Sequence, residues 1–266
     1  MIQGIPMKVV AIIPARMAAT RFPGKPLAKI CGIPMIGHCL LRSQMAKSLD
    51  EVYVATCDRE IYDYVLSIGG KAVMTASSHE RATDRTAEAL RKIEQLSGKR
   101  FDCVAMVQGD EPLVHPDMID RGIGPFVDFP SIKVVNLMTP ISTIDRFESP
   151  NDVKVVVNLR SEALYFSREP IPSRKKFSGD LPMLRQLGLI FFRRDFLFEY
   201  SEMKPTPLEI IESVDMNRVL EHGEKIKMVR IDFQSLGVDV PEDLDRAARM
   251  FDDDKLLGLY RARLIN

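Results

Sequence analysis

The sequence lacks several features that define common classes of protein. Its 266 residues include no tryptophan and only four cysteines. The cysteines, Cys31, Cys39, Cys57 and Cys103, do not follow the spacing of metal ligands. Four cysteines in a chain of this length do not suggest a disulfide framework either, so we interpret them as reduced thiols of a cytoplasmic protein.

Long apolar runs and an excess of one charge are also missing. The apolar run near the start, residues 9–13, is much shorter than a membrane-spanning helix or the core of a signal peptide. Lysine plus arginine and aspartate plus glutamate each number 37, so the formal net charge is zero. This balance argues against nucleic acid or a membrane as the partner. Hydrophobic content of 45% is typical of a globular protein with a sizeable core.

The signatures of several well-known sites are absent as well. The sequence contains no Gly-x-Gly-x-x-Gly dinucleotide fingerprint, no P-loop, no zinc motif and no nucleophile elbow. The chemistry therefore has to come from residues that are scattered along the chain.

The hydrophobic pattern predicts an α/β fold. Apolar strands are expected at residues 9–13, 51–56, 71–75 and 101–107, with amphipathic helices at 34–46, 59–67 and 84–96 between them. Strand–helix–strand units with such short connections build parallel sheets, which bind ligands at the carboxyl ends of their strands. Thr83 or Asp84 is expected to cap the third helix.

The pattern changes after residue 130. Strand-like segments at 133–138, 153–157 and 188–192 have no full helix between the first two, which indicates an antiparallel insertion. Helices are expected at 194–201 and 207–222, then a strand at 226–231 and a helix that starts at 241 and continues to the end. We therefore divide the chain into residues 1–130, 131–230 and 231–266.

A loop of small residues with three cations follows the first strand. Arg16, Arg21 and Lys25 lie on it, next to Gly24. Small side chains let backbone N–H groups approach an anion and the cations neutralise it, so the loop is suited to a polyphosphate. A solvated basic loop is the alternative, and spacing alone does not decide between them.

Two carboxylates are candidates for a metal site. Asp110 follows the apolar strand at 101–107, so it is expected at the mouth of the sheet, where Mg²⁺ binds carboxylates together with phosphate oxygens. Gly109 beside it gives a ligand access to the backbone, although the same residues also form turns. Asp239 is the second candidate, but its place before a helix also suits a helix cap.

Other polar residues leave more than one interpretation open. Arg81 and Arg85 either face the cation loop or lie on a solvated helix face. Together, a cationic loop and one or two magnesium-binding carboxylates favour displacement of pyrophosphate from a nucleoside triphosphate by an oxygen nucleophile. We expect Lys25, Arg16 and Asp110 to carry that chemistry.

The chain resembles the 3-deoxy-manno-octulosonate (Kdo) cytidylyltransferases, also called CMP-Kdo synthetases, in five separated motifs. They are IPARMAATRFPGKPL at 13–27, VQGDEP at 107–112, VKVV at 153–156, ALYFSR at 163–168 with IP at 171–172, and GVDVPEDL at 237–244.

The resemblance implies a fold, a reaction and partners. The fold is that of nucleotide-diphospho-sugar transferases, with a mixed, mainly parallel central sheet, helices on both faces and an antiparallel insertion used for dimerisation. The reaction joins CMP from CTP to the anomeric hydroxyl of a 2-keto-3-deoxy sugar acid and releases pyrophosphate, for lipopolysaccharide or capsule assembly. Mg²⁺ is the implied cofactor, and a homodimer is the implied assembly.

The resemblance also assigns residues to roles. Those implied for the nucleotide are Ala15, Arg16, Lys25, Arg85, Gln108, Gly109 and Pro112. Asp110 and Asp239 are implied as magnesium ligands. Those implied for the sugar acid are Arg168, Gln186, Glu209, Glu212 and Asn217.

The sequence departs from the family pattern near both substrates. Arg81 and Ala82 replace a Ser-Gly pair close to the nucleotide, while Gln186 and Ile190 replace a histidine and a tyrosine that help to bind the sugar acid. The late-helix motif Glu-Gln-Leu reads Asp215-Met216-Asn217. Loss of polar partners usually accompanies a changed acceptor.

Two alternatives therefore remain open beside Kdo. The same chemistry on another anionic acceptor, such as 8-amino-Kdo or a nonulosonic acid, keeps the nucleotide site and changes the acid. A catalytically silent nucleotide-binding relative keeps the fold but has no need of both Asp110 and Asp239. The sequence retains both.

Overall fold

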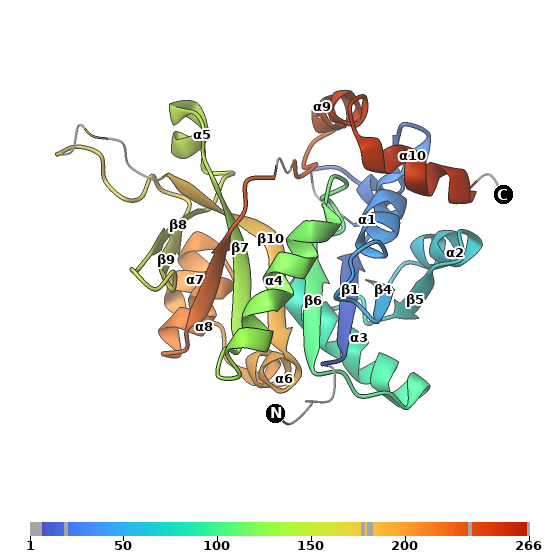
Figure 1. Ribbon diagram of the computed structural model, residues 1–266, viewed down its shortest axis with the longest axis horizontal. Coiled ribbons are helices and arrows are strands. Elements are labelled where there is room, and N and C mark those ends of the chain that lie inside the picture. The colour runs from blue at the N-terminus through green and yellow to red at the C-terminus, as the bar shows by residue number, and fades with distance from the viewer. Residues whose placement is uncertain (1–6, 19–20, 177–178, 180–182, 234–235, 265–266) are drawn as a thin grey trace. The chain divides into compact units, whose positions relative to one another are not determined.

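The computed structural model describes residues 7–18, 21–176, 179, 183–233 and 236–264 (Figure 1). The chain forms two compact units, one of Met1–Asp120 with Gln234–Asn266 and the other of Arg121–Phe233. The first boundary falls inside helix α4 (Pro116–Asp128), which the sequence pattern did not indicate. Within the described ranges, no helix has both the length and the apolar character needed to cross a membrane.

The sheet of the first unit is parallel, as predicted. Its strands are β1 (Val9–Ala15), β4 (Glu51–Thr56), β5 (Lys71–Met74) and β6 (Cys103–Val107), in the spatial order β6-β1-β4-β5. Every residue of β1 and β6 is buried. The two apolar strands are therefore fully buried neighbours, and the residues that follow them emerge at the same edge of the sheet.

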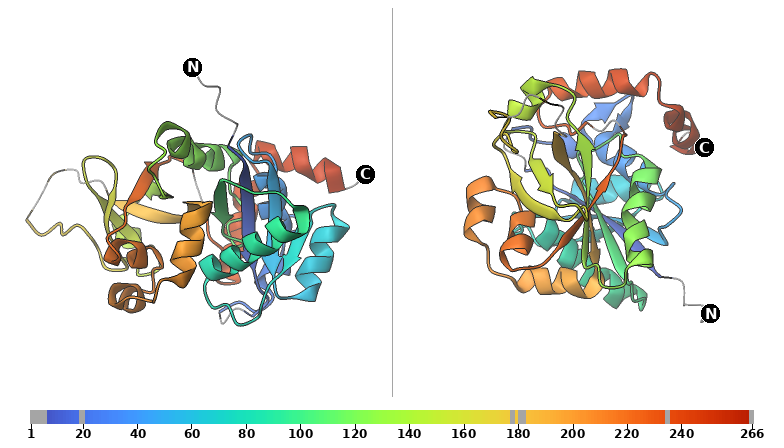
Figure 2. Two further views of the ribbon diagram at one scale, coloured as in Figure 1. Left: turned by 90° about the horizontal axis from the view of Figure 1, so that it is seen from below. Right: turned by 60° about the vertical axis from the view of Figure 1, so that its left-hand side comes forward.

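The predicted helices of the first unit connect these strands. They are α1 (Met35–Ser43), α2 (Arg59–Ser67) and α3 (Ala82–Ser97), and α1 and α3 lie on opposite faces of the sheet (Figures 1 and 2). The expected cap of α3 was wrong: the cap is Arg81, whose carbonyl accepts the first helical hydrogen bond, from Arg85 N at 3.3 Å. Thr83 is instead buried in the first turn.

Short elements and two C-terminal helices complete the first unit. A 3₁₀ turn at Lys25–Leu27 and the short strands β2 (Lys29–Ile30) and β3 (Ile33–Pro34) precede α1. The expected single C-terminal helix is two, α9 (Glu242–Phe251) and α10 (Lys255–Arg261), followed by a 3₁₀ turn at Ala262–Leu264. The break has a local cause, since the Asp254 carboxylate caps α10 by accepting from Leu256 N.

A buried histidine joins the C-terminal helices to α1. His38 is fully buried, with Nε2 2.8 Å from the Ile30 carbonyl and Nδ1 2.7 Å from the Tyr260 hydroxyl. A carbonyl only accepts, so Nε2 carries the proton and Nδ1 accepts from Tyr260 in the neutral ring. Burial is the largest cause that lowers the pKa of His38, and together with the nearby Arg42 cation it brings that pKa to about 4.

Acid is therefore expected to destabilise the chain through His38. In the unfolded chain, the histidine has its ordinary pKa of about 6.5 and takes up a proton below that pH. In the folded chain, His38 takes up this proton only below about pH 4, so the free energy of unfolding falls as the pH drops from about 6.5 to 4. The shift corresponds to about 3 kcal/mol of unfolding free energy. Urea unfolding of wild type and His38→Gln between pH 7 and 4 measures this effect. An equal change of unfolding free energy with pH in the two proteins would contradict the prediction.

The second unit contains the mixed part of the fold. β10 (Leu184–Arg193) pairs antiparallel with β7 (Val134–Pro140) and with β8 (Lys154–Val157), and β8 pairs antiparallel with β9 (Ala163–Ser167). β11 (Ile226–Arg230) lies parallel to β7. The predicted antiparallel pairing is confirmed, although β9 and the first residues of β10 were not predicted as strand.

The helices of the second unit are short. They are α5 (Ile144–Glu148), α6 (Arg194–Glu202), α7 (Pro207–Glu212) and α8 (Met216–Glu221). The predicted single helix at 207–222 was wrong, because Ser213 takes the left-handed conformation, with φ of 52°, and ends α7. The chain then turns before α8 begins.

Candidate functional site

A cavity of about 310 Å³ lies in the first unit where β1 and β6 end. Its lining residues are Pro14, Ala15, Arg16, Arg21, Lys25, Pro26, His79, Glu80, Arg81, Ala82, Arg85, Gln108, Gly109, Asp110 and Asp239. The position agrees with the expected ligand site at the carboxyl ends of parallel strands. Cations outnumber carboxylates in this lining, so the cavity favours an anion.

The loop after β1 has defined anchors. Met17 N donates to the Asp58 carboxylate at 2.8 Å, and Gly24 N donates to the Met17 carbonyl at 3.0 Å. Gly24 takes a left-handed conformation with φ of 76°, which glycine adopts without strain. These contacts turn the chain back so that Lys25 faces the cavity.

Lys25 lies between the two carboxylates that the sequence singled out. Its Nζ donates to Asp110 Oδ2 at 2.8 Å and to the Val238 carbonyl at 2.8 Å, and it lies 3.9 Å from Asp239 Oδ1. Arg21 contacts the same Asp239 oxygen at 2.9 Å. Residues far apart in the sequence therefore meet around one ammonium group.

The backbone explains how Asp239 reaches this position. Val238 N donates to the Asp110 carbonyl at 2.9 Å, which ties the segment before α9 to the segment after β6. The alternative that Asp239 caps α9 does not hold, because Asp243 accepts the hydrogen bonds of Asp239 N and Val240 N. The Asp239 side chain is left to face the cations of the loop.

The donor set is compatible with a magnesium ion. Asp110 and Asp239 reach the same Lys25 Nζ, and their side chains are 32% and 45% exposed, so a hydrated ion has access to both. Mg²⁺ commonly takes one or two carboxylates and completes its shell with phosphate oxygens and water. In the part of the chain that the structure describes, no group of three or more His, Cys, Asp or Glu side chains is placed to hold a metal.

Gly109 is required for packing as well as for access. A Cβ on Gly109 would come within 2.8 Å of the Pro14 carbonyl and 3.4 Å of Ala15 Cβ. The close approach that demands glycine here is therefore that of the chain's own backbone at the end of β1.

We expect Gly109→Ala to destabilise the protein and to lower activity. The overpacked Cβ costs about 1–3 kcal/mol, which lowers the melting temperature by several degrees and shifts the segment that carries Asp110. Thermal melting and pyrophosphate release measure the two effects. Gly258→Ala is the control, since its Cβ meets nothing within 4 Å. Unchanged behaviour of Gly109→Ala would contradict the packing argument.

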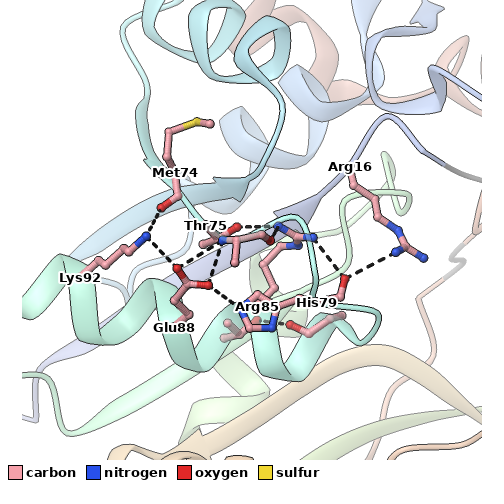
Figure 3. A network of polar contacts seen from close by, with 10 residues as sticks. Arg16, Met74, Thr75, His79, Arg85, Glu88 and Lys92 are labelled. Carbon is pink, nitrogen blue, oxygen red and sulfur yellow. Dashed lines mark hydrogen bonds and ion pairs between the residues drawn. The ribbon is translucent and has the colours of Figure 1, made fainter.

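Arg85 is held inside the protein beside the cavity (Figure 3). It is 2% exposed, and its guanidinium donates to Thr75 Oγ1 at 2.5 Å, to the Ala76 carbonyl at 3.1 Å and to the His79 carbonyl at 3.3 Å. The alternative of a solvated helix face is therefore wrong for Arg85. Arg16 also donates to the His79 carbonyl, at 3.5 Å.

Glu88 accompanies Arg85 on α3. Its carboxylate accepts from Ala76 N and pairs with Lys92 and with the His79 ring. Although burial raises the pKa of Glu88, the hydrogen bonds from Lys92, Ala76 N and His79 outweigh it and lower that pKa to about 2. Glu88 is therefore ionised at neutral pH.

Most other residues implied for the nucleotide also border this cavity. Ala15 and Gln108 line it, and so do Arg81 and Ala82, where the chain departs from the family pattern. Pro112 is buried and does not line it. Its role toward the nucleotide stays a prediction.

The residues implied for the sugar acid lie in the second unit. The Glu212 carboxylate accepts from the Tyr165 and Ser167 hydroxyls at 2.8 and 2.7 Å and from Arg168 N at 2.8 Å. The Arg168 side chain donates to the carbonyls of Glu212 and Pro150. The structure thus brings Arg168 and Glu212 together.

The other three residues implied for the sugar acid form their hydrogen bonds with groups of the protein itself. Glu209 is 1% exposed and pairs with Arg218 through two contacts of 2.6 Å. Asn217 bonds the backbone of Phe166, and Gln186 donates to Asn136 at 2.7 Å. Their contact with a sugar acid stays a prediction.

Two contributors to the cavity were missed by the sequence analysis. Asp58, just before α2, was not singled out, yet its carboxylate anchors the cation loop by accepting from Met17 N. Glu88 was not singled out, although Arg85, Glu88 and Lys92 repeat at a spacing that places them on one face of a helix.

Comparisons with known proteins agree with this geometry. The sequence profile of the family described as Cytidylyltransferase matches residues 10–226. The chain is 45% identical over 250 residues to the 3-deoxy-manno-octulosonate cytidylyltransferase of Geobacter metallireducens, a match that covers 90% of this chain and 96% of the relative. Identity to that of Geotalea daltonii is 43% over 257 residues, covering 93% and 99%.

A solved structure is similar over almost the same length. It is that of a CMP:2-keto-3-deoxy-manno-octonic acid synthetase complexed with CTP, with a TM-score of 0.86 and 36% sequence identity. The match covers 92% of this chain and 98% of that one. The expected nucleotidyltransferase fold is confirmed by this similarity.

Proposed function

The chain belongs to the cytidylyltransferase family, among the 3-deoxy-manno-octulosonate cytidylyltransferases, and from this we propose that it makes CMP-Kdo from CTP and Kdo. The observation that carries the proposal is the meeting of Lys25, Asp110 and Asp239 at one cavity. The reaction forms a bond between the anomeric oxygen of Kdo and the α-phosphorus of CTP. It breaks the bond to the β-phosphate oxygen, releases pyrophosphate and passes the hydroxyl proton to water.

The cations of the first loop bind the triphosphate in this proposal. Arg16 and Arg21 are exposed at the cavity, and Lys25 lies deeper, with 13% of its side chain exposed. Their charges offset the repulsion between the phosphates and the incoming anionic acid. They also stabilise the charge that gathers on the leaving pyrophosphate.

Asp110 and Asp239 hold Mg²⁺ in this proposal. When bound, the ion acts as a Lewis acid on the phosphate oxygens. Asp110 and Asp239 would be the protein ligands of the ion, and Lys25 supplies a cation next to them. No side chain has to form a covalent intermediate, which agrees with the absence of a nucleophile motif from the sequence.

We propose that the second unit binds Kdo and that its exposed apolar side chains form the contact between the two subunits of a homodimer. Arg168 and its neighbour Glu212 are the proposed contacts for the acid, as the family resemblance implies. The proposed homodimer is supported by Leu208, Ile210 and Ile211 on α7, which are 37%, 64% and 75% exposed. We propose a cytoplasmic location because CTP is a cytoplasmic substrate.

A coupled assay of pyrophosphate release tests the function. We expect turnover with CTP, Mg²⁺ and Kdo, and loss of turnover with EDTA. Parallel reactions with 8-amino-Kdo and a nonulosonic acid test the acceptor, because Gln186 and Ile190 depart from the family pattern. Turnover of another acid with Kdo inert would overturn the acceptor, and binding of CTP without turnover of any acid would favour a silent relative.

A further inference from the structure

One wall of the cavity has no helix or strand of its own. Residues 75–81, here called the wall segment, connect β5 to α3, and His79, Glu80 and Arg81 from this segment line the cavity. Such a segment needs partners for its backbone groups, and these partners determine where its side chains lie. Several of these partners are side chains of α3.

Two cations of α3 hold backbone carbonyls of this wall. Lys92 donates to the Met74 carbonyl, just before the wall segment, at 2.9 Å. Arg85 donates to the carbonyls of Ala76 and His79 (Figure 3). Lys92 and Arg85 lie seven positions apart on α3, so they are on the same face of the helix.

Glu88 lies between these two cations and binds donors of the same segment. Its carboxylate accepts from Ala76 N, at 3.2 and 3.0 Å for the two oxygens, and pairs with the ring of His79. An ionised carboxylate only accepts, so His79 Nε2 carries the proton that it donates. Glu88 therefore holds the wall segment at two residues, Ala76 near its start and His79, which lines the cavity.

The wall segment is also linked to the cation loop. The His79 carbonyl that accepts from Arg85 accepts from Arg16 as well, at 3.5 Å. The position of His79 therefore influences where the Arg16 guanidinium lies at the cavity. A displacement of the wall segment would be transmitted to a proposed phosphate-binding cation.

We propose that Glu88 is a positioning residue for CTP, which acts through His79 and Ala76 to hold the wall segment and Arg16 in their binding positions. This inference rests on the proposed function. Glu88 does not line the cavity, so its effect on CTP is indirect. It is expected to act on binding of the nucleotide and not on the chemical step, because Asp110 and Lys25 are held by contacts of their own.

Substitution of Glu88 by glutamine tests the proposal with little change in shape. Glutamine has one acceptor oxygen, and its amide group donates, so it cannot satisfy Ala76 N, His79 and Lys92 together. We expect the KM for CTP to rise about tenfold, as for the loss of one charge-assisted hydrogen bond, with kcat within about twofold of wild type. Isothermal titration with CTP should show a similar loss of affinity.

Three further variants separate positioning from stability. Glu94→Gln changes the same residue type on the same helix, where its carboxylate accepts from Phe101 N at 3.1 Å, and should leave the KM for CTP unchanged. His79→Gln keeps a donor close to the position of Nε2 and should stay nearer to wild type than His79→Ala. The His79 pair applies the same test if Glu88→Gln does not fold.

The outcomes distinguish this inference from the function on which it rests. Wild-type protein that does not bind CTP would overturn both. Wild type that binds CTP, with Glu88→Gln binding equally well, would overturn the positioning role alone. A lower melting temperature with an unchanged KM would assign Glu88 to stability only and would also overturn it.

Discussion

We expect Asp110→Asn to reduce kcat for pyrophosphate release at least about 10³-fold, equivalent to about 4 kcal/mol of transition-state stabilisation. The Asp110 carboxylate accepts from Lys25 Nζ at 2.8 Å, and Asp239 Oδ1 lies 3.9 Å from the same nitrogen. Asparagine keeps the shape and one acceptor oxygen, so Lys25 retains a partner. What is lost is the negative charge that a divalent cation needs.

The fold should tolerate this change. Asp110 is partly exposed and comes after β6, outside the buried strand. We therefore expect the melting temperature to change by no more than about 2 °C, a shift that corresponds to less than about 1 kcal/mol. Circular dichroism melting and the coupled pyrophosphate assay measure the two quantities on the same preparation.

Asp63→Asn provides the matched control. Asp63 pairs with Arg59 on the exposed face of α2, and its side chain is 53% exposed. It should retain full activity. If Asp110→Asn kept the activity of this control, Asp110 would have no part in the mechanism.

The parallel half of the fold was predictable because its signals are local. Buried strands such as β1 are continuous apolar runs, and the helices between them show apolar residues at helical spacing. The meeting of the cation loop with Asp110 followed from topology, since β1 and β6 are parallel neighbours and their carboxyl ends share one edge. The position of Asp239 could be predicted only from the family resemblance. It lies more than a hundred residues after Asp110, and no hydrophobic periodicity indicates that the chain returns to that edge of the sheet.

Other features depended on tertiary contacts that the sequence does not display. Helix α4 contains Pro125 and two glycines, which lowers its helix signal. One of the glycines, Gly122, is required by packing, because a Cβ there would come within 2.1 Å of the Phe191 ring. The end of α7 at Ser213 could not be predicted either, because serine is not a residue that indicates a left-handed conformation.

The contacts of Arg85 and Glu88 were unpredictable for a different reason. Several of their partners are backbone groups of Ala76 and His79, which almost any pair of residues would supply at these positions. Only the path of the chain between β5 and α3 brings them within reach. The sequence shows that Arg85, Glu88 and Lys92 lie on one face of a helix, but it does not show which part of the protein that face contacts.

We expect Lys25→Met to have two effects of opposite sign. The ammonium group lies 2.8 Å from Asp110 Oδ2 and 3.9 Å from Asp239 Oδ1, so it competes with a divalent cation for both carboxylates. Its removal should tighten binding of Mn²⁺ to the protein several-fold. The same removal deprives the triphosphate of its most buried cation of the loop, so kcat/KM for CTP should fall about 10²-fold or more.

Two variants define how specific these effects are to the ammonium at this position. Lys29→Met removes an exposed lysine four positions further along the chain and should change neither quantity. Lys25→Arg keeps the charge but replaces a compact ammonium by a planar guanidinium, so it should recover only part of the activity. Water-proton relaxation or electron paramagnetic resonance measures Mn²⁺ binding without any turnover.

The two measurements separate attraction for phosphate from competition for the carboxylates. If Lys25 served only to neutralise Asp110 and Asp239, Lys25→Met would bind Mn²⁺ more tightly and would not lose activity at saturating metal. If it served only the triphosphate, activity would fall and Mn²⁺ affinity would not rise. Because the Lys25 Nζ lies within 4 Å of both carboxylates and borders the cavity, we expect both changes in one protein. A result with either change alone would contradict the dual role.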